Sequence, residues 1–337
     1  MRKLFHLCLL VLALSQNSAA QADTIADIRE RGHLNCGVSQ GIEGFSSRNS
    51  AGDWHGFDVD ICRAVAVAIL GKDGKSEFVP LSAEQRFSAL RDKQVDILSR
   101  NTTWTMKRDL ELDLAFPAIT YFDGQGFMLP ASLVIDSIAQ LSGAKICILS
   151  GTSSETNIRA YFELENLEYS TVVSLSRPEM LSRYERGECD VVSADRSALF
   201  GDRLQLKDPA GHLVLSDIIS KEPLGPVVRD NDPSLQDIVR WTVSLLVTAE
   251  EAQLLRSSIA KPNEEMSALQ KLFLSRSGAL GSTLGLGENW ARDVVGTVGH
   301  YGEIFKRNLG SASPLGISRG NNALWYDGGL LYAPPMR

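Results

Sequence analysis

A short polar turn ahead of an arginine is the first place where the residue types of this sequence suggest chemistry. The stretch NTTWTMKR places Asn101 and Thr103 shortly before Arg108. A guanidinium offers paired, planar donors that match a carboxylate. A turn at a strand end can aim a threonine hydroxyl and a backbone N–H at the same anion. The stretch therefore predicts an anion site, with a solvated Arg108 beside its acidic neighbours as the alternative.

A second candidate site is the stretch ILSGTSSETN. A strand runs into Gly151, the hydroxyls of Thr152 and Ser153 follow, and a helix is expected to begin near Ser154. Free backbone N–H groups at a helix start help to bind anions. Ordinary helix capping by the same hydroxyl residues is the alternative interpretation.

Asp195 closes the expected strand CDVVSAD at the point where the next helix starts. Its carboxylate is either a helix N-cap or the counter-ion of an ammonium group. An arginine and an aspartate in one cleft would together bind a zwitterion.

Other chemistries find little support in the sequence. The five histidines are scattered and form no ligand cluster, so no metal is expected. The stretch GISRG formally fits a nucleophile motif but lies in a Gly- and Asn-rich tail rather than between a strand and a helix. Neither a P-loop nor a dinucleotide fingerprint is present, so no cofactor is expected. The net charge of −7 and the lack of a basic block argue against nucleic acid and anionic membranes as partners.

The elements that must position these side chains follow a strand–helix alternation. In the first half, strands are expected at 32–39, 76–81 and 95–100, with helices at 57–70 and 83–94 between them. In the second half, strands are expected at 124–130, 144–150, 170–175, 189–195 and 223–229, with helices at 151–166, 177–188 and 232–253. Parallel α/β units gather ligands at the carboxyl ends of their strands, where all three candidate stretches lie.

The fold class predicted from this pattern is α/β, with two lobes and a central cleft. Lobe 1 is expected to span 23–122 with 232–262, and lobe 2 to span 123–231, with crossings at Tyr121–Gly126 and at the Asp230–Pro233 turn. The composition then changes, because Gly, Ser and Asn become common, and 263–337 is expected to form a C-terminal extension packed on a lobe. Helices are expected there at about 264–274 and 288–307, followed by an irregular tail.

Residues 1–22 have the features of a secretory signal peptide. Arg2 and Lys3 precede an apolar run, and Ala20-Gln21-Ala22 fits a small-residue cleavage pattern ahead of Asp23. Cys8 has no small-residue box that would indicate lipidation. No later stretch is apolar enough to span a membrane, so the mature chain is expected to be exported without membrane insertion.

Four further cysteines lie in the expected mature chain. An even number in an exported chain allows two disulfides with three possible pairings. Sequence order favours one disulfide in each lobe, Cys36–Cys62 and Cys147–Cys189.

These stretches resemble the periplasmic amino-acid-binding proteins of ABC transporters, which are two-lobed type II solute receptors. The resemblance is carried by GFDVDICRAVA, NTTWTMKR, GTSSE and CDVVSAD, over about 30–260. The stretches YFDGQGFML, SKEPLGPVVR, GHYGEIFKRNLG and GGLLYAPPMR further resemble the subgroup of general L-amino acid receptors.

The resemblance implies a periplasmic, monomeric, non-enzymatic receptor that binds L-amino acids and delivers them to an inner-membrane ABC permease. An exported dehydratase of the same fold, acting on prephenate-like acids, is the alternative. Such an enzyme would need a general acid beside a carboxylate clamp, for which Glu43 or Asp195 is available.

The resemblance also implies roles for individual residues. Asp195 binds the ligand's α-ammonium, and Arg108 binds its α-carboxylate. The residues expected to assist Arg108 are Thr103, Asn101, Thr152 and Ser153.

Two further residues are expected to meet the ligand's side chain. Phe45, in the loop after the first strand, is expected to cover its apolar part. Arg86 matches a position that meets acidic side chains in some relatives, or reaches side chains through water. Asn101 departs from the serine often found at its position in the family.

Overall fold

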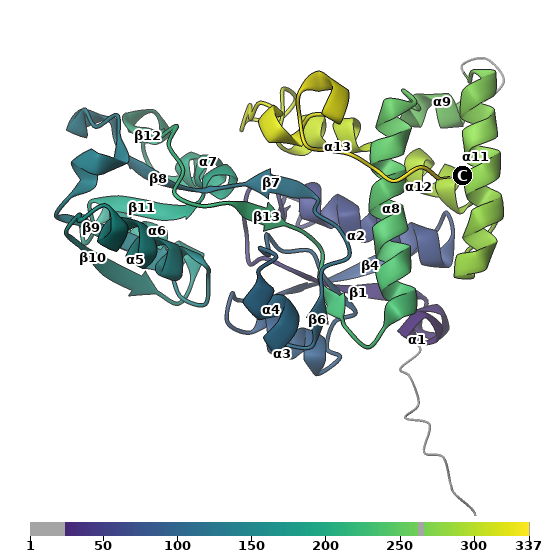
Figure 1. The fold of residues 1–337 in the computed structure, drawn as a ribbon, viewed down its shortest axis with the longest axis horizontal. Helices are drawn as coiled ribbons and strands as arrows, with labels where there is room; N and C mark the ends of the chain where they lie inside the picture. The colour runs from purple at the N-terminus through teal and green to yellow at the C-terminus, as the bar shows by residue number, and fades with distance from the viewer. Residues whose placement is uncertain (1–23, 262–265, 337) are drawn as a thin grey trace, which may run out of the picture.

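Two lobes lie side by side in the computed structural model, which describes residues 24–261 and 266–336 (Figure 1). The expected signal peptide lies outside the described residues. In the described part of the chain, no helix combines the length and apolar character needed to cross a membrane.

The first lobe is built on a parallel three-stranded sheet in the order β4-β1-β5. Helix α2 is apolar on nearly all sides because the sheet covers one face and the C-terminal extension covers another. The strands are β1 (His33–Val38), β4 (Lys75–Pro80) and β5 (Ile97–Leu98), with the hairpin β2 (Ser47–Arg48) and β3 (Trp54–His55). The helices are α1 (Thr24–Arg31), α2 (Phe57–Leu70), α3 (Arg86–Arg91), α4 (Met106–Glu111) and α8 (Pro233–Glu251).

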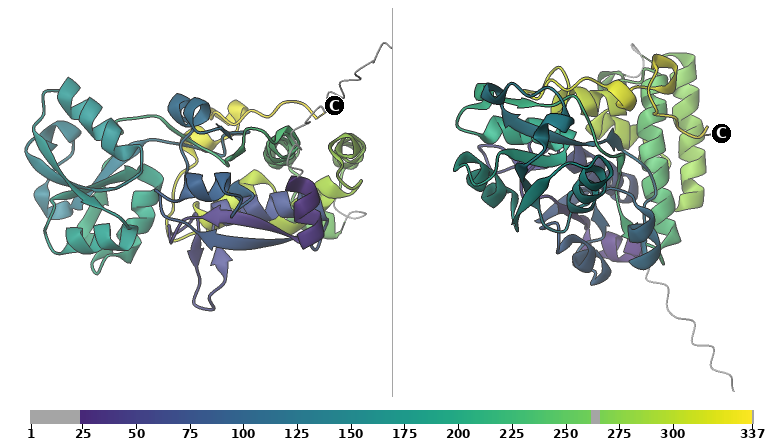
Figure 2. Two further views of the ribbon diagram at one scale, coloured as in Figure 1. Left: turned by 90° about the horizontal axis from the view of Figure 1, so that it is seen from below. Right: turned by 60° about the vertical axis from the view of Figure 1, so that its left-hand side comes forward.

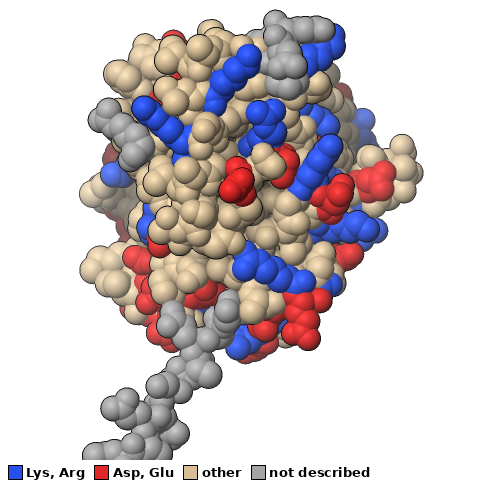
Figure 3. Space-filling view, turned by 90° about the vertical axis from the view of Figure 1, so that its right-hand side faces the viewer, with Lys and Arg blue, Asp and Glu red and all other residues tan. Residues whose placement is uncertain are grey.

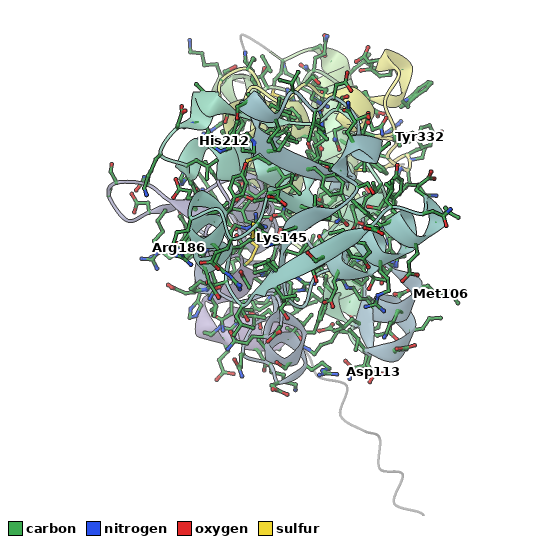
Figure 4. All side chains as sticks on the ribbon, turned by 90° about the vertical axis from the view of Figure 1, so that its left-hand side faces the viewer. Met106, Asp113, Lys145, Arg186, His212 and Tyr332 are labelled. Carbon is green, nitrogen blue, oxygen red and sulfur yellow. A yellow bond between two sulfur atoms is a disulfide. The ribbon has the colours of Figure 1, made fainter. Side chains whose placement is uncertain are left out.

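The second lobe has a five-stranded sheet in the order β10-β9-β11-β8-β12, in which β8 and β12 run antiparallel to their neighbours. Lys145 and Arg186 lie on the side of the second lobe that faces the viewer in Figure 4. Its strands are β8 (Gln125–Pro130), β9 (Ala144–Leu149), β10 (Tyr169–Ser174), β11 (Val191–Asp195) and β12 (His212–Val214). Its helices are α5 (Ser154–Leu164), α6 (Arg177–Glu185) and α7 (Arg196–Gln205).

Two antiparallel strands connect the lobes, β7 (Tyr121–Asp123) and β13 (Glu222–Leu224) (Figure 2). The second connection therefore precedes the expected crossing at Asp230–Pro233. In the segment between them, β14 (Val228–Arg229) already pairs with β6 (Leu114–Ala115) on the side of the first lobe. The turn signals at 230–233 instead start α8, because Asp232 caps that helix by accepting a hydrogen bond from Leu235 N.

The C-terminal extension packs on α2 and α8 of the first lobe. The continuous helix expected at 288–307 is divided at Gly299, which has a φ of +79°. His300 then begins a new helix with a capping box. Acidic and basic side chains are mixed over the face that the extension helps to form (Figure 3). The helices of this region are α11 (Ala268–Gly281), α12 (Trp290–Val298) and α13 (Tyr301–Asn308), and the short α9 (Arg256–Ala260) precedes it.

Side chains of the extension hold the connecting strand β7 and the residues before it. Asn322 is 3% exposed; its Oδ1 accepts from Phe122 N at 2.7 Å, and its Nδ2 donates to Phe122 O at 3.1 Å. The Tyr301 hydroxyl donates to Thr120 O at 2.8 Å. The amide of Asn322 therefore replaces a neighbouring strand on one edge of the connection.

Both expected disulfides are present. Cys36 is bonded to Cys62 between β1 and α2, and Cys147 is bonded to Cys189 beside the sheet of the second lobe. Each covalent link therefore stays within one lobe, and neither disulfide bridges the two lobes.

Replacing Asn322 by alanine should destabilise the protein, because it removes the partners of both backbone groups of Phe122. We expect a loss of about 1–3 kcal/mol in the free energy of unfolding, measured by urea denaturation. The exposed neighbour Asn321 provides the matched control. Equal effects of Asn322→Ala and Asn321→Ala would contradict the assigned role.

Candidate functional site

A polar cavity lies between the lobes, and both lobes line it. It is formed where strands β5, β9 and β11 end, together with the starts of helices that face those ends. This is where side chains from parallel strands converge. Its lining residues are Ile42, Arg86, Arg100, Asn101, Thr103, Arg108, Leu149, Thr152, Ser153, Ser154, Arg177, Ser193, Ala194 and Asp195.

The turn after β5 is held in place by Asp58 at the start of α2. Asp58 accepts hydrogen bonds from Ser99 Oγ at 3.1 Å and from Asn101 N at 3.0 Å. Burial raises the pKa of Asp58 to about 7, against the lowering effect of these donors. Asn101 has a φ of +43°, and its side-chain Oδ1 and Nδ2 are buried without a protein partner. The turn therefore leaves an unsatisfied amide at the cavity.

Three arginines of the first lobe enter the cavity with only backbone carbonyls as hydrogen-bond acceptors. Arg100 Nε donates to Leu81 O at 3.0 Å, and Arg108 Nη1 donates to Thr103 O at 2.8 Å. Arg86 Nη2 reaches across to Gly151 O of the second lobe at 3.1 Å. Among the described residues, no carboxylate lies within 4.0 Å of any of these three guanidiniums, whereas most buried charges are paired.

Burial shifts all three of these arginines toward their neutral forms. It lowers the pKa of Arg86 well below its usual range, and the charges of Arg100 and Arg108 lower it further. Burial lowers the pKa of Arg100 to about 9 and also lowers that of Arg108. The Phe87 ring lies 4.6 Å from the Arg86 guanidinium carbon and 5.4 Å from that of Arg108. The site thus concentrates positive charge against an apolar ring.

A fourth arginine of the cavity, Arg177 at the start of α6, has a carboxylate partner. Its Nη1 lies 2.5 Å from Oδ2 of the fully buried Asp202. Arg177 is therefore largely neutralised inside the second lobe, unlike the three arginines of the first lobe.

Asp195 faces the cavity rather than capping the following helix. It occupies the N-cap position of α7, but its side chain makes no capping hydrogen bond. Burial raises the pKa of Asp195 well above its usual range, and the nearby charges of Asp123 and Glu222 raise it further. A cationic ligand group beside Asp195 would lower that pKa and restore the carboxylate.

Seven of the eight candidate residues line the cavity, and Phe45 does not. Phe45 is 1% exposed and packs edge-on against Phe57 at 6.1 Å and Tyr121 at 5.5 Å. Its ring belongs to the core of the first lobe because the loop turns it inward. Ile42 from the same loop lines the cavity instead.

Sequence reasoning missed Arg100, Arg177 and Ile42. Arg100 was assigned to the end of a strand, although it directly precedes the polar turn. Arg177 begins the first turn of a helix directly after a strand, and this position was a usable signal. Ile42 lies in the loop after β1, where the hydrophobic periodicity of the sequence does not indicate which side chain faces the cavity.

Comparison with known proteins places this cavity in context. The family model of bacterial extracellular solute-binding proteins, family 3, matches residues 34–258. The general L-amino acid-binding periplasmic protein AapJ of Rhizobium johnstonii is 46% identical over 322 residues, covering 95% of this chain and 94% of that protein. The glutamate/glutamine/aspartate/asparagine-binding protein BztA of Rhodobacter capsulatus is 42% identical over 331 residues and 97% of each chain.

A solved structure extends the likeness to the fold. An ABC transporter periplasmic binding protein from Brucella ovis, with glutathione bound, matches with a TM-score of 0.89 and 45% identity. The match covers 94% of this chain and 100% of that chain. It therefore includes most of the C-terminal extension as well as the two lobes.

Replacing Arg86 by methionine should stabilise the arrangement of the lobes described here, in which Arg86 is buried, when no ligand is added. Arg86 is 2% exposed, has no carboxylate partner, and its Nε is without an acceptor. Methionine keeps packing against Phe87 while removing the buried charge. We expect a gain of about 1–2 kcal/mol in the free energy of unfolding, seen as a higher Tm.

The matched control is Arg91→Met at the exposed end of the same helix. A Tm of Arg86→Met that stays at or below both the wild-type and Arg91→Met values would show that the buried guanidinium is not a destabilising charge.

Proposed function

This chain belongs to the bacterial extracellular solute-binding proteins, family 3, and from that membership we propose that it is the L-amino acid-binding component of an ABC transporter. In this proposal the chain is exported to the periplasm, binds its ligand between the lobes, and delivers it to an inner-membrane permease. It acts as a monomer and catalyses no reaction. The names of the Rhizobium and Rhodobacter relatives support the ligand class.

The observation that carries the proposal is the separation of charge inside the cavity. Guanidiniums enter from the first lobe, and the unpaired Asp195 enters from the second. An α-amino acid presents a carboxylate and an ammonium on one carbon, so it can satisfy both lobes at once. We assign the α-carboxylate to Arg108 and the α-ammonium to Asp195.

The two remaining unpaired arginines support a second anionic group on the ligand. One α-carboxylate satisfies a single guanidinium. Among the described residues, Arg86 and Arg100 then still lack a carboxylate within ion-pair distance, with only the more distant charges of Asp195 and, for Arg100, Asp58 opposing theirs. A side-chain carboxylate would pair with them and raise the pKa of both guanidiniums toward the usual range. We therefore propose that L-glutamate and L-aspartate are among the preferred ligands. The glutathione held by the Brucella structure also carries a glutamyl α-amino acid group, so γ-glutamyl peptides belong in the ligand test.

Closure of the lobes supplies the step from binding to transport. Arg86 donates across the cleft to Gly151, and Ser150 Oγ donates to Glu84 Oε1 at 2.5 Å. These contacts form only when the lobes approach, so a ligand that bridges the lobes shifts the population toward this arrangement. The closed surface is then the form that the permease receives.

Calorimetric titration of the ligand-stripped protein tests the proposal. We expect saturable binding of several L-amino acids, tightest for acidic ones, without turnover. Glutathione, D-alanine and prephenate complete the panel. Consumption of prephenate without binding of amino acids would overturn the proposal and assign the raised pKa of Asp195 to general acid catalysis.

Replacing Arg108 by alanine should weaken every amino acid ligand to a similar extent, because all share the α-carboxylate. A lost charge-assisted pair predicts a decrease in affinity of roughly tenfold to a hundredfold. Lys107→Ala is the matched control, since Lys107 lies on the same short helix with its side chain 81% exposed. Selective loss for only some amino acids would contradict the carboxylate assignment.

A further inference from the structure

Glu222 connects both lobes to the strand that joins them. It lies on β13, is 2% exposed, and accepts four hydrogen bonds. Its Oε2 accepts from Thr103 Oγ1 at 2.5 Å and from Ser153 Oγ at 3.0 Å. Its Oε1 accepts from Asn157 Nδ2 and Ser220 Oγ, each at 2.6 Å. Thr103 belongs to the first lobe and Ser153 to the second.

These hydrogen bonds determine what the two hydroxyls offer to the cavity. A hydroxyl has one proton to donate and two lone pairs with which to accept. Because Thr103 and Ser153 donate to Glu222, each faces the cavity with lone pairs alone. An acceptor of this kind suits an ammonium group and not a carboxylate.

Two other hydroxyls of the cavity are committed in the same way. Thr152 Oγ1 donates to Leu149 O at 2.7 Å, and Ser193 Oγ donates to Gly126 O at 2.8 Å. These four hydroxyls are therefore left to act as acceptors toward the cavity. Donors for a carboxylate come instead from the arginines and from the unpartnered amide of Asn101.

We propose that Glu222 is a positioning residue for ligand recognition, which orients the hydroxyls of Thr103 and Ser153 so that both accept from the ligand's ammonium group beside Asp195. The inference rests on the proposed function and assigns a residue that the ligand need not touch. It also reassigns Thr103 and Ser153, which the sequence led us to expect on the carboxylate side.

The placement of Glu222 also makes ammonium recognition depend on closure. Thr103 and Ser153 lie on opposite lobes, so one carboxylate oxygen accepts from both only when the lobes are together. The acceptor set is therefore complete in the closed arrangement and divided in an open one. A ligand without an ammonium group gains nothing from completing it.

The substitution Glu222→Gln tests the inference. Glutamine keeps the shape of glutamate, but its amide NH₂ donates where a carboxylate oxygen accepted. A hydroxyl beside that NH₂ must accept from it and turn its own proton elsewhere. A hydroxyl whose proton points into the cavity repels an ammonium group. We expect affinity for L-glutamate to fall roughly tenfold or more, while affinity for glutarate, which lacks the ammonium group, changes much less. Titration calorimetry measures L-glutamate, and competition at high concentration measures glutarate.

The matched control is Glu84→Gln. Glu84 also accepts a hydrogen bond across the cleft, from Ser150, but it is exposed and does not line the cavity. It reports what the loss of a closure contact alone does to both ligands. Equal losses for L-glutamate and glutarate in Glu222→Gln would overturn the inference and leave Glu222 as a structural closure contact. A wild-type protein that does not bind L-glutamate would instead contradict the proposed function, and with it the inference.

A double-mutant cycle gives a second test that does not need glutarate. Thr103→Val removes the hydroxyl and keeps the branched shape. If Glu222 acts through Thr103, then Glu222→Gln should cost much less L-glutamate affinity in the Thr103→Val background than in the wild type. Additive losses would show that Glu222 does not act through that hydroxyl.

Discussion

Positive charge buried between the lobes, with no carboxylate of the described residues in ion-pair contact, is the constraint on which the rest of this structure depends. Arg86, Arg100 and Arg108 are removed from water and hydrogen-bond only to carbonyl groups. Such charges destabilise a fold unless something else neutralises them. The cavity therefore suits the anionic ligand group proposed above, because a bound carboxylate would neutralise these charges.

The remainder of the chain holds these charges in place while leaving the lobes able to separate. Each disulfide lies within one lobe, and β7 and β13 carry the chain from one lobe to the other. The C-terminal extension adds its core to the first lobe and fixes the start of β7 through Asn322 and Tyr301. The extension and the first lobe thus share one hydrophobic core, and the arginines of the cavity lie on this larger unit. Glu222 lies on this connection and contacts side chains of both lobes.

Much of the architecture and part of the site could be predicted from the sequence. Alternating strands and helices gave the two α/β units, and the polar turns at strand ends pointed to Thr103, Arg108 and Asp195. The cysteine order gave the observed disulfide pairing. These features are local or follow from chain order, so a single sequence contains them. The strand end before Asn101 also contained Arg100, whose importance depends on lacking a carboxylate partner, and no sequence pattern shows that.

The features that were missed depend on how distant segments meet. The loop after β1 turns Phe45 into the core and Ile42 toward the cavity, and nothing in the loop's composition distinguishes the two. Glu222 was hidden in a stretch that reads as an ordinary strand, because its four donors come from three separate parts of the chain. The turn at Asp230–Pro233 resembled a lobe boundary but starts a helix. A crystal structure of the protein with L-glutamate bound would test the central claim most directly. The account predicts the α-carboxylate on Arg108, the side-chain carboxylate near Arg86 and Arg100, and the ammonium group beside Asp195. Two results would contradict it: a ligand bound outside this cavity, or an ammonium group bound beside the backbone carbonyl oxygens that accept from these arginines.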